Sequence, residues 1–332
     1  MGQDVRQADI AKKLGVSIVS VSRALSGKEG VGEGLRDSIL SVACDMGYVA
    51  KEQKNAKENM SAVGVLIAEH YLRFEHSFFL ALNLHLTQAL SDLGVLSYLK
   101  VVQSHCADDG MDIPDNVSGL VVVGKLPEDC LKFLEETTLP LVYLDFYAPD
   151  SRAVSVLADG YLGGWDITRH LLKCGHRNIG YLGSIDSDYN AQDRYYGYCK
   201  ALAEEGLAPQ AQWVIPNRAR EGFFENYILP KPLPSAFVCD CDQSAYQFTR
   251  DLVRQGYRVP DDVSVTGFYN HVFSTLITPA LTTYAIDKAQ MGRKAAEAIT
   301  MLLKGESMAR RITVSGGLVL RDSVKMLYSE AT

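Results

Sequence analysis

Residues 9–25 read DIAKKLGVSIVSVSRAL, and the spacing of their apolar side chains predicts two short helices that meet at a tight turn. Ala11 is small enough to let the second helix approach the first, and Val21 is placed to anchor that second helix. Gly15 can adopt the left-handed backbone conformation that such a turn requires. Ser17 stands where the second helix needs an N-cap. The stretch therefore predicts a helix-turn-helix.

The second of these helices is the candidate DNA-reading element, because a helix-turn-helix lays its second helix in the major groove. Val21, Ala24 and Leu25 are predicted to face inward. The candidate DNA contacts are then Ser17, Ile18, Val19, Ser20, Ser22 and Arg23. Arginine can bind guanine through two hydrogen bonds, serine can hold phosphates, and isoleucine and valine can contact thymine methyl groups. A small three-helix protein-interaction module is the alternative that the pattern leaves open.

The rest of the chain divides into three segments. A third helix is predicted over residues 33–46, which completes an all-α headpiece at 1–50. Residues 51–61, KEQKNAKENMS, are polar and predict a linker. Residues 62–332 alternate short Val/Leu/Ile-rich strands with helical patterns, which predicts an α/β core of two doubly wound parallel-sheet subdomains. The last predicted strand covers residues 310–320. In such folds ligands bind outside the carboxyl ends of the strands.

Composition narrows the function without deciding it. The chain has 332 residues with 33 Lys and Arg against 40 Asp and Glu, so no overall basic field indicates a nucleic-acid or membrane partner. Residues 1–60 hold nine basic and eight acidic side chains. No secretory signal and no apolar run long enough to span a membrane is recognisable, so we expect a cytoplasmic protein. The seven scattered cysteines favour free thiols in a reducing compartment.

Motifs for catalysis or metal binding are not found. The chain carries no G-x-G-x-x-G after its first core strand, no G-x-x-x-x-G-K-[ST] and no G-x-S-x-G. Cys239 and Cys241 flank an aspartate, but no second Cys or His pair accompanies them, and buried thiols explain them better than a metal site. We therefore expect no catalytic residues, no metal and no cofactor.

In the motifs that it carries, the chain resembles the LacI/GalR family of bacterial transcription regulators. Residues 9–25 match the family signature D-[VI]-A-x-x-x-G-V-S-x-x-[ST]-V-S-R-x-L throughout. Further matches are LLKCGHRNIGYLG at 171–183, RYYGY at 194–198, GYRVPDDVSVTGF at 256–268 and the P-x-L-T-T segment within 277–299. The resemblance covers some 310 residues.

The resemblance implies a repressor that acts as a homodimer on a palindromic operator in double-stranded DNA. Its periplasmic-binding-protein-like core would hold a small effector between two subdomains. The first subdomain would comprise about 62–157 plus 287–318, and the second about 158–284. The short tail at 325–332 lacks the extra helix that makes some relatives tetramers.

Five effector contacts carry over from the family pattern. Asp145 matches a carboxylate that binds sugar hydroxyls, and Arg194 matches a cleft arginine whose fork can hold a hydroxyl pair or a carboxylate. Phe78 or Phe79 lies where aromatic rings stack on ligands, and a core position is the alternative for both. Asp242 follows Cys241 where the family has an Asn-Asp pair. Tyr269 follows an aromatic residue where the family often has aspartate. Tyrosine in place of aspartate removes an acceptor and supplies a ring, so this position departs from a simple monosaccharide site. The resemblance implies a sugar or a sugar phosphate as the effector, and NVSGLVVVGK at 116–125 resembles galactoside regulators of the family.

The linker departs from the family, whose hinge wedges a leucine into the minor groove. Here the linker lacks leucine and offers only Ala56 or Met60, which predicts weaker DNA bending or a specificity that depends more on the major groove. The rival functions are a solute-binding or ligand-sensing module, which shares the core fold, and an enzyme built on the same core. A solute-binding protein should have an export signal and no helix-turn-helix.

Overall fold

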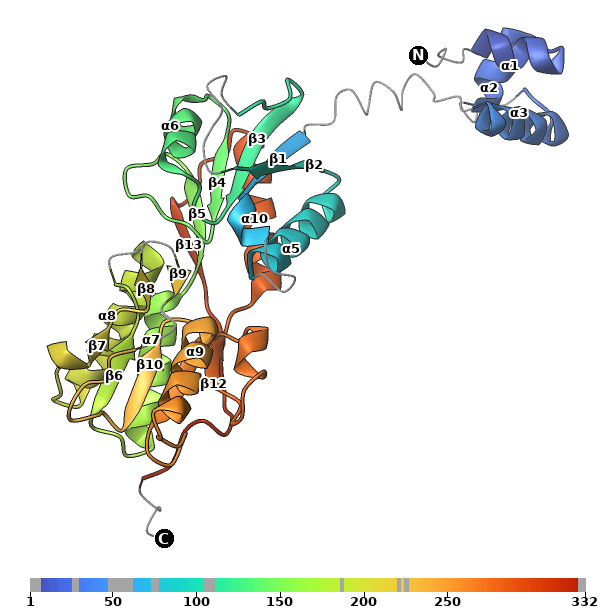
Figure 1. Ribbon diagram of the computed structural model, residues 1–332. Coiled ribbons are helices and arrows are strands. Elements are labelled where there is room, and N and C mark those ends of the chain that lie inside the picture. Colours follow the sequence, from blue (N-terminus) through green and yellow to red (C-terminus); the bar gives the residue numbers. More distant parts are fainter. Residues whose placement is uncertain are drawn as a thin grey trace. The chain divides into compact units, whose positions relative to one another are not determined.

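The structure is a computed structural model, and it describes residues 7–25, 30–46, 62–72, 78–103, 111–185, 188–219, 222–223 and 227–327 (Figure 1). The chain divides into a headpiece unit, Met1–Met60, and a core unit, Ser61–Thr332. The predicted linker at 51–61, with Ala56 and Met60, lies outside the described residues.

The headpiece unit consists of three helices around a small apolar core. These are α1 (Gln7–Leu14), α2 (Ile18–Leu25) and α3 (Glu33–Asp45). Gly15 ends α1 with φ +65°, the left-handed conformation that the sequence predicts there. The core side chains come from all three helices and are Ile10, Ala11, Val21, Ala24, Ile39 and Ala43. The two-helix prediction and the inward positions of Val21 and Ala24 are therefore confirmed.

The first sheet of the core unit has six parallel strands in the order β13-β5-β4-β3-β1-β2. They are β1 (Ala62–Ala68), β2 (Leu96–Val102), β3 (Val117–Val123), β4 (Leu141–Leu144), β5 (Val154–Ala158) and β13 (Arg311–Val314). Helices α5 (Phe78–Asp92) and α10 (Lys288–Leu303) cover one face, and α6 (Glu128–Glu136) covers the other. Along β1, Val65 packs against α5 and α10, and Leu66 packs against α6. Both faces of the strand are thus buried, which explains why its sequence is continuously apolar.

The second sheet has the order β14-β12-β11-β10-β6-β7. Its strands are β6 (Ile179–Leu182), β7 (Val214–Ile215), β10 (Ala236–Cys239), β11 (Ser264–Tyr269), β12 (Thr282–Ala285) and the antiparallel β14 (Gly317–Val319). Helices α7 (Gly160–Lys173) and α8 (Tyr189–Glu204) cover one face, and α9 (Asp242–Arg254) covers the other. Short elements complete the unit: 3-10 helices η1 (Glu69–Leu72), η2 (Ala211–Trp213) and η3 (Val272–Ser274), and the strand pair β8 (Arg218–Ala219) and β9 (Gly222–Phe223). The fold class is as predicted.

One predicted strand proves to be two. Residues 310–320 form β13 in the first sheet and β14 in the second, with the crossing at Gly316. A Cβ on Gly316 would lie 2.0 Å from the carbonyl oxygen of Ala285, so the backbone can turn here only because the side chain is absent. The predicted subdomain boundary at residue 318 therefore lies too far along the chain. β14 and the residues after it belong to the second subdomain.

The described cysteines differ from the prediction at one position. Cys130 forms a disulfide, so the expectation of free thiols is wrong for this residue. Cys174, Cys199, Cys239 and Cys241 are free thiols, and no group of His, Cys, Asp and Glu side chains suited to a metal ion occurs among the described residues. None of the described helices is both long and apolar enough to cross a membrane.

Candidate functional site

Helix α2 presents an exposed face that is fixed by its first turn. The hydroxyl oxygen of Ser17 accepts a hydrogen bond from the backbone N–H of Ser20 at 3.0 Å, which is N-cap geometry. Ile18 and Val19 follow the cap and are 53% and 61% exposed, an unusual exposure for two adjacent large apolar side chains. Ser22 and Arg23 are exposed one turn later. Five of the six candidate DNA contacts are thus solvent-accessible, and Ser20 is half-buried.

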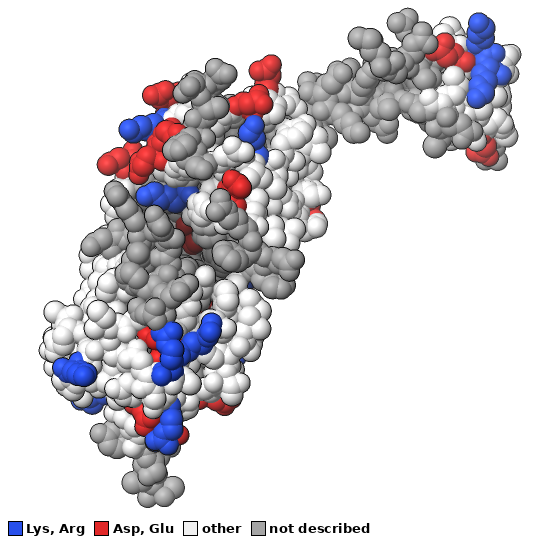
Figure 2. Space-filling view, viewed as in Figure 1, with Lys and Arg blue, Asp and Glu red and all other residues white. Residues whose placement is uncertain are grey.

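Basic and acidic side chains both occur on the surface of each unit, as the similar numbers of each in the sequence suggest. Figure 2 shows Lys and Arg side chains gathered on one side of the headpiece unit, with acidic side chains elsewhere on it. On the face of the core unit in view, both signs are interspersed (Figure 2). The described residues in this view therefore form no large field of a single sign on the core unit.

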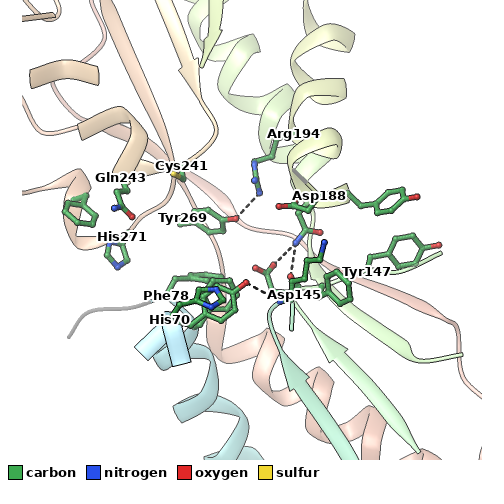
Figure 3. Close-up of a pocket in the computed structure, with 17 residues that line it drawn as sticks. His70, Phe78, Asp145, Tyr147, Asp188, Arg194, Cys241, Gln243, Tyr269 and His271 are labelled. Atoms are coloured by element: carbon green, nitrogen blue, oxygen red, sulfur yellow. Dashed lines mark hydrogen bonds between the residues drawn. The ribbon is translucent and has the colours of Figure 1, made fainter. Parts of the chain in front are cut away.

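The core unit holds a cavity of about 370 Å³ where strands of both sheets end (Figure 3). Of the five predicted effector contacts, Phe78, Asp145, Arg194 and Tyr269 line it. They come from α5, the end of β4, α8 and the end of β11, which places two on each side of the cavity. The volume lies within the range of about 300–1,000 Å³ that small-molecule sites occupy.

Aromatic rings form one wall of this cavity. The Phe78 ring lies 4.6 Å from the Tyr269 ring, measured between centroids, and 5.3 Å from the Phe79 ring. Tyr71 lies 3.8 Å from Phe79. Tyr147 and Tyr189 make an edge-to-face pair elsewhere on the lining. Such rings can stack on the apolar face of a sugar or on a planar ring.

Asp145 is the buried carboxyl of the cavity. It follows β4 with φ +62°, a conformation that aspartate adopts more readily than most side chains. The Nδ2 of Asn190 donates to the backbone oxygen of Asp145 at 3.0 Å and to its Oδ1 at 3.3 Å. Burial raises the pKa of Asp145 to about 7, although the positive charge of Arg194 acts in the opposite direction.

Arg194 reaches the cavity because two helices pack backbone to backbone. A Cβ on Gly164 of α7 would lie 2.2 Å from the carbonyl oxygen of Arg194, and a Cβ on Gly197 of α8 would lie 2.0 Å from that of Tyr161. The glycines therefore permit a close crossing of α7 and α8. From it, the Arg194 guanidinium extends to the Tyr269 hydroxyl, to which its Nη1 donates at 2.9 Å (Figure 3).

Asp242 does not line the cavity. Its side chain is fully buried at the start of α9, where its carboxylate accepts hydrogen bonds from the Thr283 hydroxyl at 2.6 Å and from the backbone N–H of His271. It stabilises the loop after β11 and so positions Tyr269 indirectly. The prediction of Asp242 as an effector contact does not fit this placement, because both of its oxygens already bind protein donors.

Several lining residues escaped the sequence analysis. They are His70, Tyr71, Lys125, Tyr147, Asp188 and Asn190, together with Gln243, His271 and Phe273 across the cavity. Most stand within a few residues of the carboxyl end of a parallel strand, which is the signal that could have found them. Asn190 has no such signal, since it lies in the first turn of α8.

Comparison with known proteins connects both parts of the chain to transcriptional repressors. A periplasmic binding protein-like domain matches residues 168–324. The HTH-type transcriptional repressor PurR of Glaesserella parasuis is 27% identical over 305 residues, which cover 88% of each chain. PurR of Pasteurella multocida is 28% identical over 332 residues, which cover 96% of this chain and 98% of the relative. These relatives are repressors and not enzymes, in agreement with the sequence analysis.

Solved structures share the fold. The Lac repressor dimer bound to operator and the anti-inducer ONPF aligns with a TM-score of 0.74 at 21% identity, over 97% of this chain and 100% of that one. The transcriptional regulator CelR in complex with cellobiose aligns with a TM-score of 0.66 at 21% identity, over 96% and 99%. The signature at 9–25, the matched core domain and the repressor relatives all support the resemblance of this chain to the LacI/GalR family of transcriptional regulators.

Proposed function

We propose that this protein is a cytoplasmic repressor that binds a palindromic operator in double-stranded DNA as a homodimer and is controlled by a small effector. The second helix of each headpiece, α2, would enter the major groove of one half-site. The effector would bind in the core cavity. Repression would follow from occupancy of the operator.

The observation that carries the DNA-binding role is the exposed, capped face of α2. Ile18 and Val19 stand out from the helix directly after the Ser17 cap, where the N-terminal turn of a recognition helix meets base edges. We assign thymine methyl contacts to these two, a guanine contact to Arg23, and phosphate contacts to Ser17 and Ser22. The Ser20 hydroxyl lies 2.9 Å from that of Ser17. We therefore assign it a role in the helix cap as well as a contact with DNA.

For the effector we propose a saccharide, with a galactoside as the first case to test. A sugar ring could stack on Phe78, while its hydroxyls bind Asp145 and Arg194. A regulator of similar fold was solved with cellobiose, which supports a sugar site in this architecture. Asp242 is left out of this assignment because of its placement at α9.

The switch would be a shift between two arrangements of the subdomains. Arg194 and Tyr269 come from the second subdomain, and Phe78 and Asp145 come from the first, so a ligand that contacts all four favours one relative position. Such a ligand changes operator affinity if the two positions hold the paired headpieces at different spacings. A coupling free energy of about 1–3 kcal/mol is enough for a useful response.

The test is a selection of random DNA duplexes by the purified protein, repeated with a panel of sugars. We expect an enriched palindrome whose binding changes with one compound. Arg23→Ala should abolish site-specific binding and leave the fold intact, whereas Arg177→Ala, which removes an exposed arginine of the core unit, should have no effect. Normal operator affinity in Arg23→Ala would refute the assignment of α2. Absence of any enriched duplex would favour a ligand-sensing module without operator binding.

A further inference from the structure

Arg194 is a buried cation that makes no direct ion pair with a carboxylate of the described residues. Its side chain is 5% exposed, and its guanidinium carries five N–H donors. Its hydrogen bond in the structure goes from Nη1 to the hydroxyl of Tyr269, a neutral acceptor. Its Nε is buried without a hydrogen-bond partner among the described residues. A buried charge in this condition is costly until a counter-ion arrives.

The acidic residues near Arg194 act on its charge from a distance but do not contact it, and this includes Asp240 behind the cavity, whose Oδ1 accepts from Asn217 and Ser244. Asp145 and Asp188 both line the cavity, but no carboxylate oxygen of a described residue lies within 4.0 Å of the Arg194 nitrogens. The Asp145 carboxyl accepts from Asn190. The Oδ1 of Asp188 caps α8 by accepting from the backbone N–H of Ala191 at 2.8 Å. Both carboxyl groups therefore have donors of their own.

Arg194 has a neutral hydrogen-bond acceptor beside it because the neighbouring residue is Tyr269. The family pattern often has an aspartate at this position, and a carboxylate there would pair with the arginine. The phenol of Tyr269 instead orients the guanidinium from one side without neutralising it. The faces of the Phe268 and Tyr269 rings lie 5.2 Å and 5.4 Å from the guanidinium carbon, so water is excluded from much of the group.

We propose that the effector is a sugar acid with one negative charge, whose carboxylate pairs with Arg194. This inference rests on the proposed effector role of the cavity and names the chemical class of the ligand. The sugar ring would lie against Phe78, and its hydroxyls would bind Asp145 and Asn190, which line the same space. Figure 3 shows Arg194 and Asp145 directed toward this common region from opposite sides.

A carboxylate fits this site better than a phosphate. The guanidinium fork matches the two oxygens of a planar carboxylate, and one arginine balances one negative charge. A phosphate monoester carries a charge of about −1.5 to −2 at neutral pH, and the excess would face Asp145 and Asp188. Lys125 does not offset this excess well, because it is nearly half exposed and its Nζ lies 3.6 Å from Glu128.

The test compares matched ligands on the full-length protein by titration calorimetry. The probes are D-galacturonate and D-glucuronate, the neutral sugars D-galactose and D-glucose, and the 6-phosphates of those two sugars. We expect at least one uronate to bind at least tenfold more tightly than its neutral sugar and its 6-phosphate.

The decisive variant is Tyr269→Asp, which places a carboxylate beside Arg194. Tyr269 has φ +96°, and aspartate is better tolerated at positive φ than tyrosine, so the variant should fold. We expect its uronate affinity to fall at least tenfold while neutral sugars lose far less. The matched control Tyr196→Asp makes the same change at a residue of α8 that is 53% exposed and does not line the cavity, and it should bind uronate normally.

Three results would overturn the proposal: no binding of either uronate, tighter binding of the neutral sugar or the 6-phosphate, or unchanged uronate affinity in Tyr269→Asp. Duplex selection by the ligand-free protein reports on the regulator role separately. A protein that selects an operator but ignores uronates remains a regulator with a different effector. A protein that binds uronates but selects no duplex refutes the proposed function alone.

Discussion

Asn190 and Asp145 form a hydrogen-bonded pair that joins the two subdomains inside the cavity. Asn190 lies on α8 beside the second sheet, and Asp145 ends β4 of the first. A single amide group holds both the backbone oxygen and the side-chain Oδ1 of Asp145, at 3.0 Å and 3.3 Å. The same residues line the proposed effector site. A ligand that contacts them therefore acts directly on the contact between subdomains.

Replacement of Asn190 tests this bridge. Asn190→Ala should weaken effector binding about fivefold, because a hydrogen bond of this kind is worth about 1 kcal/mol. Titration of the effector into the variant measures the effect. Asn116→Ala, which removes an exposed amide bonded to Tyr98, serves as the control and should bind normally. An unchanged affinity in Asn190→Ala would show that the bridge does not contribute to ligand binding.

The buried carboxyl of Asp145 should make stability depend on pH. Burial raises its pKa from the usual 3.8 to about 7, so the folded protein holds a proton that the unfolded chain releases between these values. The contribution of Asp145 to the free energy of unfolding is thus present below about pH 4 and is lost as the pH rises through about 7.

The variant Asp145→Asn cannot lose this proton. Its stability relative to the parent should therefore increase between pH 4 and pH 7, by an amount on the order of 4 kcal/mol for a shift of this size. Urea unfolding at several pH values measures the difference. Asp150→Asn, at an exposed position, controls for the loss of one negative charge. A constant difference between Asp145→Asn and the parent would mean that Asp145 is not buried as described.

The crossing of α7 and α8 should not tolerate a methyl group. In Gly164→Ala the new Cβ would lie 2.2 Å from the carbonyl oxygen of Arg194, so α8 must move. We expect a loss of about 1–3 kcal/mol of stability and weaker effector binding, because Arg194 moves with its helix. Thermal unfolding and ligand titration measure the two effects. Gly317→Ala adds a methyl group in open space and should change neither.

The cap of α2 should affect both stability and DNA binding. Ser17→Ala removes the acceptor of the Ser20 N–H, at a cost of about 1 kcal/mol to the helix, and it removes a proposed phosphate contact. Ser22→Ala removes a proposed phosphate contact from the exposed middle of the helix and should lower operator affinity alone. Headpiece melting and operator titration of both variants separate these roles. Equal melting temperatures for the two variants would contradict the capping role.

The sequence was most informative where structure is local. The turn at Gly15, the cap at Ser17 and the burial of Val21 follow from backbone conformation and helical spacing within nine residues of one another, and all three are present in the structure. Continuous apolar strands likewise predicted parallel sheets covered on both faces. The disulfide at Cys130 was missed because pairing depends on the distance between two Cα atoms, which sequence alone does not give.

For the cavity, the sequence supplied residue types, and the tertiary structure decided which of them meet. Phe78, Asp145, Arg194 and Tyr269 are separated by up to 191 positions, and strand order brings them together. Asp242 had the right chemistry, but hydrogen bonds to Thr283 and His271 direct it away from the ligand space. Sequence thus determined the helix-turn-helix and the two-unit organisation, because these depend on local patterns. The charge balance around Arg194 was decided only by the fold, since it depends on which polar groups from separate elements come within hydrogen-bond distance, and among the described residues only Tyr269 of β11 does so.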